Sequence, residues 1–98
     1  MSDNLPPPAF WERLNAVVHL ANQQCGAASP NDVGSSTMYA AARFNAFILA
    51  KTTGSAETMQ SERERALEYF TGQFRLMMES NLDDFTANYV DYMKTTPR

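Results

Sequence analysis

A positive charge stands in the middle of the most apolar stretch of this sequence. Residues 38–50 read Met-Tyr-Ala-Ala-Ala-Arg-Phe-Asn-Ala-Phe-Ile-Leu-Ala, where Arg43 and Asn45 interrupt a run of apolar and aromatic side chains. A guanidinium group that leaves water needs a carboxylate partner or a bound anion, because burying it unpaired is very costly. One interpretation is therefore a site for an anionic ligand, held by Arg43 and Asn45 over the rings of Phe44 and Phe47.

The other interpretation of Arg43 is structural, and we favour it because ion-pair networks produce the same signal as functional sites. An ion pair to an acidic residue of a neighbouring helix would fix how the two helices dock. Asn45 would then donate or accept a hydrogen bond at that helix or its terminus. The candidate partners of Arg43 are Asp83, Asp84, Asp91 or a glutamate.

A second candidate surface is a ridge formed by Tyr69, Gly72 and Leu76, which are spaced to lie together on one side of a helix. Glycine in a helix interior costs about 1 kcal/mol relative to alanine, so Gly72 suggests a close backbone approach. Either the last helix folds back and covers this ridge, or Tyr69, Gly72 and Leu76 form an interaction surface together with Tyr92. Self-association or a protein partner is the functional alternative.

Residues for the common catalytic classes are missing. His19 is the only histidine and lies on the polar side of its helix, and Cys25 is the only cysteine, so tetrahedral zinc has no ligand set. Asp84, Asn88 and Asp91 line up at helical spacing, which is typical of a solvated face. Phosphate-binding glycine loops and nucleophile elbows are absent. We expect no metal and no cofactor, and we do not expect an enzyme.

The elements that position these residues are all helices. Apolar residues at i, i+4, i+7 and i+8 from Phe10 predict an amphipathic helix that starts near Pro8 and runs to about Gln24. A loop at residues 25–34 leads to a central hydrophobic helix at about residues 36–52, capped by Ser35 or Ser36. Since that helix is apolar on both sides, other elements should wrap around it.

The C-terminal half predicts one or two further helices. Gly54 suits the left-handed position that ends the central helix. Ser55 suits the N-cap of the next helix, which is predicted to reach Glu79. A bend in this long helix can occur near Gly72. Asn81 reads as the N-cap of a last helix. The fold class is all-α, a three- or four-helix orthogonal or bundle domain. Residues 1–8 are a flexible Pro-rich N-terminus, residues 9–94 a single helical domain and residues 95–98 a frayed C-terminus.

The composition of the chain limits the cellular environment and the classes of partner that we expect for it. The chain has 98 residues, 44% of them hydrophobic, and a formal charge of −3 with eight scattered basic residues. Binding to a nucleic-acid backbone needs a concentrated basic surface, so we expect no nucleic acid. Residues 38–50 are too short to span a membrane, and the N-terminus lacks the features of a signal peptide. We expect a cytoplasmic protein with no membrane contact.

Several segments carry a resemblance to a known family. Phe-Trp-Glu-Arg at residues 10–13, Met-Tyr-Ala-Ala-Ala-Arg-Phe-Asn-Ala-Phe at residues 38–47 and Asn-Leu-Asp-Asp-Phe-Thr-Ala-Asn-Tyr at residues 81–89 resemble a family of small proteobacterial proteins, domain of unknown function 3144. The resemblance spans roughly residues 10 to 93. It implies a short, stand-alone bacterial domain with no assigned activity, and it brings no catalytic residues.

Two functions from different classes remain. The first is a non-enzymatic interaction or accessory module, a homodimer or a binder of another protein, which follows from the surplus of aromatic surface and the missing catalytic residues. The alternative is a binder, or an unrecognised type of enzyme, that holds a small anionic ligand with Arg43 in an aromatic-lined pocket.

Overall fold

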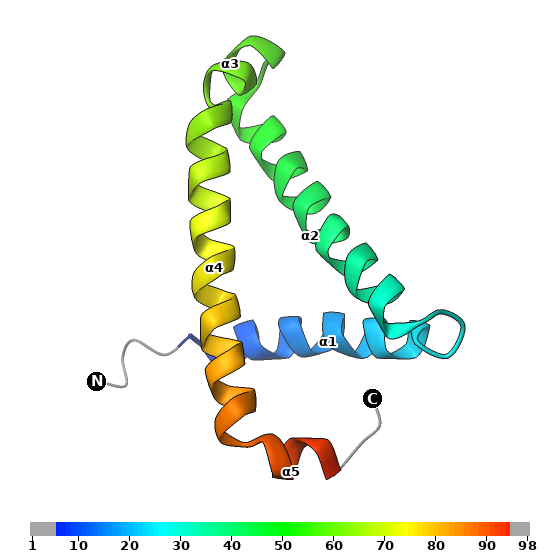
Figure 1. Cartoon of the computed structure of the whole chain (residues 1–98). Coiled ribbons are helices and arrows are strands. Elements are labelled where there is room, and N and C mark those ends of the chain that lie inside the picture. The colour runs from blue at the N-terminus through cyan, green and yellow to red at the C-terminus, as the bar shows by residue number, and fades with distance from the viewer. Residues whose placement is uncertain (1–5, 95–98) are drawn as a thin grey trace. The chain divides into compact units, whose positions relative to one another are not determined.

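The computed structural model describes residues 6–94, and these residues form five helices without a β-strand. The predicted all-α class is confirmed, with five helices where three or four were expected. The expectations for residues 1–5 and 95–98 lie outside the described residues. Along the chain (Figure 1) the helices are α1 Pro8–Gln24, α2 Pro30–Thr53, α3 Ala56–Ser61, α4 Arg63–Ala87 and α5 Tyr89–Lys94.

The chain divides into two compact units, and the boundary between them falls within α2, between Phe44 and Asn45. The first unit contains α1 and the N-terminal half of α2. The second unit contains the rest of α2 with α3, α4 and α5. The prediction that residues 9–94 form a single domain stays a prediction.

Helix α1 has the bounds that its sequence pattern predicts. Pro8 occupies the first turn, where a missing N–H costs nothing because that group has no partner in the helix. Pro7 precedes it in an extended conformation, and its carbonyl accepts the N–H of Phe10 at 2.9 Å. The helix ends at Gln24, directly before Cys25 and Gly26.

Helix α2 begins six residues earlier than the predicted start at residue 36, so the predicted caps Ser35 and Ser36 are wrong. The Ser29 hydroxyl accepts the N–H of Asp32 at 3.1 Å, and Pro30 follows as the first helical residue. A serine cap, a proline in the first turn and an acid near the positive end of the helix dipole all favour this start. The Gly, Pro and Asn residues of segment 25–34 predict a loop. Pro30 and Asn31 are nevertheless tolerated in the first turn of a helix, and Gly34 lies inside α2.

The other end of α2 agrees with the sequence. Lys51 lies in the last turn, and Gly54 follows the helix with a φ angle of +80°, a conformation that side chains with a Cβ rarely adopt. Ser55 then caps α3 as predicted, since its hydroxyl accepts the N–H of Thr58 at 3.1 Å.

The chain breaks between α3 and α4 rather than near Gly72. Glu62 separates the two helices with φ −93° and ψ 0°, and its N–H points back to carbonyls of the preceding turn. Ser61 contributes to the break because its hydroxyl donates to the carbonyl of Thr58 at 2.8 Å. Helix α4 then runs without interruption through Gly72 to Ala87, about 37 Å at 1.5 Å per residue.

Asn81 is not an N-cap, which corrects the predicted start of the last helix. It lies inside α4, and its side-chain amide donates to the carbonyl of Met77 at 2.8 Å. The helix ends instead at Ala87, and Asn88 is its C-cap, with φ −115° and ψ 23°. Asp83 and Asp84 therefore lie near the C-terminal end of α4, where the helix dipole disfavours negative charge.

Large apolar side chains remain accessible throughout the described helices. Val33, 6% exposed, is the single buried hydrophobic residue in the described part of the chain. On α2, Phe44 and Phe47 are 65% and 60% exposed, and Leu76 on α4 is 60% exposed. Within its own compact unit, each of these side chains is therefore left largely accessible.

Within residues 6–94, none of the helices combines the length and the hydropathy that crossing a lipid bilayer requires.

Candidate functional site

Arg43 lies on the surface of α2 and contacts an aromatic ring. Its guanidinium carbon is 5.5 Å from the centroid of the Tyr39 ring, one helical turn earlier. Such a cation–π contact contributes about 0.5–1 kcal/mol at an exposed site. No carboxylate forms an ion pair with Arg43 among the described residues of the first unit. The predicted pairing with Asp83, Asp84, Asp91 or a glutamate stays a prediction.

The same pairing of cation and ring recurs two turns further along α2. The Lys51 ammonium lies 5.7 Å from the centroid of the Phe47 ring. Tyr39, Arg43, Phe47 and Lys51 are each four residues apart, so each lies next to the one before it and about 40° further around the helix axis, and we name them the α2 row. Sequence reasoning named Arg43 and Phe47 but missed Tyr39 and Lys51, which the i,i+4 spacing alone could have identified.

The four predicted ligand-binding residues do not converge from this one helix. Arg43 and Phe47 share a side of α2, whereas Asn45 lies about 200° around the helix axis from Arg43 and Phe44 about 100°. Asn45 is half-buried and Phe44 is exposed. The geometry of α2 therefore gives an exposed row of two cations and two rings rather than a closed ligand pocket. The anion site of Arg43, Asn45, Phe44 and Phe47 stays a prediction.

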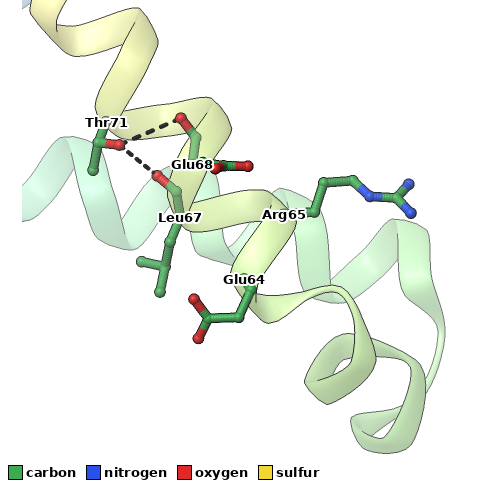
Figure 2. Close-up of a pocket in the computed structure, with 5 residues that line it drawn as sticks. All are labelled: Glu64, Arg65, Leu67, Glu68 and Thr71. Atoms are coloured by element: carbon green, nitrogen blue, oxygen red, sulfur yellow. Dashed lines mark hydrogen bonds between the residues drawn. The ribbon is translucent and has the colours of Figure 1, made fainter.

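Helix α4 carries shallow hollows along one face. The first is lined by Glu64, Arg65, Leu67, Glu68 and Thr71, all from this one helix (Figure 2). Figure 2 shows these side chains spread around the helix rather than converging on one point, and the Thr71 hydroxyl donates to the carbonyls of Leu67 and Glu68. A hollow lined by a single helix encloses no small molecule.

The second hollow continues the first along α4, with Thr71 shared between them. It is lined by Phe74, Met78 and Leu82, with charged side chains of Arg75 and Glu79 beside them. Thr71 and the apolar residues that line the two hollows follow the helical repeat, together with two further phenylalanines of the same face. We name this set the α4 stripe: Leu67, Phe70, Thr71, Phe74, Met78, Leu82 and Phe85.

The predicted ridge lies on the side of α4 opposite the stripe. Tyr69 is 58% exposed, and its ring packs edge-on against Phe70 with centroids 5.1 Å apart. Leu76 is exposed, and a Cβ added to Gly72 would meet no atom within 4 Å. In the second unit α5 contacts the end of α4 and leaves the ridge uncovered. The role of Tyr69, Gly72, Leu76 and Tyr92 as an interaction surface stays a prediction.

Tyr92 belongs to the joint between α4 and α5 rather than to the ridge. Its hydroxyl donates to the carboxylate of Asp84 at 3.1–3.2 Å, and its ring packs edge-on against Phe85 at 4.8 Å. The Asn88 amide donates to the same carboxylate at 2.9 Å and to the Asp84 carbonyl at 3.0 Å. These contacts fix the turn at Asn88 and occupy the acid that the sequence places on a solvated face.

The hydrogen bond to Asp84 raises the pKa of Tyr92 above the ordinary value for tyrosine, assisted by desolvation and by the negative charges of Asp84 and Asp91. Because the folded-state pKa is the higher one, the stability that Tyr92 contributes is complete below pH ~10 and is lost as the pH rises through the raised value. We expect Asp84→Asn to return the ionisation of Tyr92 toward lower pH.

Ultraviolet titration of tyrosinate formation measures this shift. Subtracting the titration curve of Tyr92→Phe from that of the wild type gives the ionisation of Tyr92 alone. Subtracting the curve of the double variant Asp84→Asn/Tyr92→Phe from that of Asp84→Asn gives the ionisation of Tyr92 without the Asp84 carboxylate. Equal midpoints in the two backgrounds would show that Asp84 does not hold the proton of Tyr92.

The remaining polar candidates do not assemble into a centre. His19 is exposed on α1, and Cys25 is half-buried at the end of that helix. Among residues 6–94, no three His, Cys, Asp or Glu side chains are grouped so that they could hold a metal ion.

Comparison with known proteins gives one match. No curated protein and no solved structure shows significant similarity to the chain. A family model described as a protein of unknown function (DUF3144) matches residues 10–86, from the first turns of α1 almost to the end of α4. This match covers more than half of the chain and includes the α2 row and the α4 stripe. The chain therefore belongs to the DUF3144 family.

Proposed function

We propose that this chain is a non-enzymatic helical interaction module that works in the cytoplasm and binds through its apolar helix faces. One observation carries the proposal: within each of the two compact units, the large apolar side chains of the helices are left accessible, while Val33 is the single hydrophobic residue buried in the described part of the chain. Monomeric proteins rarely expose large contiguous apolar surfaces, and such surfaces mark interaction sites.

Two experiments test the proposal. The first is a native pull-down from the host of this protein, with the captured proteins identified by mass spectrometry. The second is thermal unfolding, monitored by circular dichroism. We expect the chain to be recovered in a complex of defined stoichiometry, with its own second copy or with another protein. A strictly monomeric chain that unfolds cooperatively, with a midpoint independent of concentration, and that recovers nothing would contradict the proposal. Such a chain would bury its apolar faces without a partner.

A second candidate is the binding of an anionic group by the α2 row. This alternative is supported by the two cations of the row, Arg43 and Lys51, while Asp32 in the first turn is the only acidic residue of α2. Both cations are accessible and lie beside aromatic rings, an arrangement that suits a planar carboxylate or a phosphate.

Calorimetric titration with citrate and with inorganic phosphate tests this second candidate. We expect Arg43→Gln to lower the affinity for the anion at least about tenfold, the value of one lost charge-assisted hydrogen bond. Arg13→Gln, which removes an exposed cation from α1, is the matched control and should bind as the wild type does. The absence of any heat of binding in the wild type would rule out an anion site for these two probes.

A further inference from the structure

We infer that the partner of this module is a second copy of the same chain, and that the two copies pair antiparallel along the α4 stripe. The inference rests on the proposed function and specifies its partner. Two features of α4 itself support it, namely the order of residues along the stripe and the distribution of charge along the helix, and the length of the stripe adds to them.

The stripe suits a copy of itself because its residues are ordered almost symmetrically about Phe74. Leu67 and Leu82 lie near its two ends, seven and eight residues from Phe74. Between them, Thr71 and Met78 lie three and four residues from it. A twofold interface is self-complementary, so residue i meets residue j and j meets i. Two antiparallel stripes crossing at Phe74 would place each Leu67 beside the Leu82 of the other copy.

The charges of α4 favour the antiparallel direction over the parallel one. Its first six residues, 63–68, contain two arginines and two glutamates, whereas residues 79–84 contain Glu79, Asp83 and Asp84 and no basic side chain. Parallel pairing would bring two such acidic ends together. Antiparallel pairing sets each acidic end beside the start of the other helix, where Arg63 and Arg65 pair with Glu64 and Glu62 and the helix dipole is positive, so that no two acidic ends meet.

The stripe is also the longest apolar face that belongs to one unit of the chain. It runs from Leu67 to Phe85, about 27 Å along the helix at 1.5 Å per residue. Phe74, Leu82 and Phe85 are 47%, 58% and 46% exposed on it. In ordinary helix packing, side chains of a second helix fill hollows of this kind, so the hollows along the stripe suit a second helix.

Light scattering after size exclusion, with circular dichroism to check helicity, tests the inference on the full chain. The wild type should have twice the mass of the 11.0 kDa chain. Phe74→Glu places a charge at the centre of the stripe, and we expect monomers at concentrations where the wild type is dimeric. Leu76→Glu is the matched control, since it adds the same charge to the opposite side of the same helix, and it should remain dimeric.

A milder variant keeps the test informative if Phe74→Glu fails to fold. Phe74→Ala preserves helix propensity and removes a side chain that would be used by both copies, so we expect the dissociation constant of the dimer to rise by about a hundredfold or more. A wild-type dimer whose dissociation constant is unchanged by Phe74→Ala but raised by Leu76→Ala would overturn the inference in favour of the ridge.

The direction of pairing has its own measurement in a Cys25→Ser background. A short thiol-specific cross-linker should join Leu67→Cys to Leu82→Cys when the two variants are mixed, and should join neither variant to itself. Self-cross-linking of each variant would show parallel pairing and overturn the antiparallel arrangement.

The two proposals fail in different ways. A monomeric wild type that captures a different protein overturns the dimer and leaves the interaction module standing. A monomeric wild type that unfolds cooperatively and captures nothing overturns both.

Discussion

A hundredfold dilution of the protein is expected to lower its midpoint of thermal unfolding by about 5–10 °C. If folding requires a second copy, the free energy of unfolding falls by RT ln 100, about 2.7 kcal/mol of dimer. For a cooperative unit of two 98-residue chains, each 1 kcal/mol moves the midpoint by about 2–4 °C. Circular dichroism melts at two concentrations measure the shift directly.

Leu76→Glu provides the control for the dilution experiment, because its exposed side chain lies away from the stripe. Its midpoint should depend on concentration as the wild-type midpoint does, while that of Phe74→Glu should be low and independent of concentration. A wild-type midpoint that is the same at both concentrations would mean that one chain completes its own core.

Replacing Gly72 with alanine is expected to raise the free energy of unfolding by up to about 1 kcal/mol. Gly72 lies in the interior of α4, and a Cβ at this position meets no atom within 4 Å. Alanine therefore lowers the conformational entropy of the unfolded chain without a steric cost in the folded one. Chemical denaturation with matched protein concentrations measures the change.

Gly54→Ala is the matched control, with the opposite sign. Its surroundings are equally open, but its φ angle of +80° disfavours any side chain, so we expect a loss of about 1 kcal/mol or more. A loss of stability or of association in Gly72→Ala would show that the ridge of Tyr69, Gly72 and Leu76 is approached closely by another helix. That result would support the ridge as the interaction surface.

Local sequence signals were sufficient wherever a helix end depends on its own few residues. Pro8 starts α1, Ser55 caps α3, and Gly54 with its positive φ ends the preceding helix, all as predicted. Each of these helix ends depends on one side chain or one backbone conformation, so the residue type alone predicts its position.

The same signals failed where two local choices competed. Ser29 with Pro30 competes with Ser35 and Ser36 for the start of α2, and the earlier pair wins because it offers a cap, a proline and an acid in one turn. At Asn81 the side-chain amide donates to the carbonyl of Met77 inside α4, and the helix continues to Ala87. An asparagine can cap a helix or continue it, and its type alone does not distinguish the two.

The central helix shows most clearly what sequence determines and what it leaves to tertiary structure. Hydrophobic period and alanine content determined that residues 38–50 are helical and that Arg43 interrupts their apolar surface. They did not determine what lies against Arg43, because the contacts of a side chain depend on distant residues. Local geometry placed Arg43 over Tyr39 and tied Asp84 to Tyr92. Tertiary structure also decided that the apolar faces stay accessible within each compact unit, because burial depends on how helices dock, which no local pattern encodes.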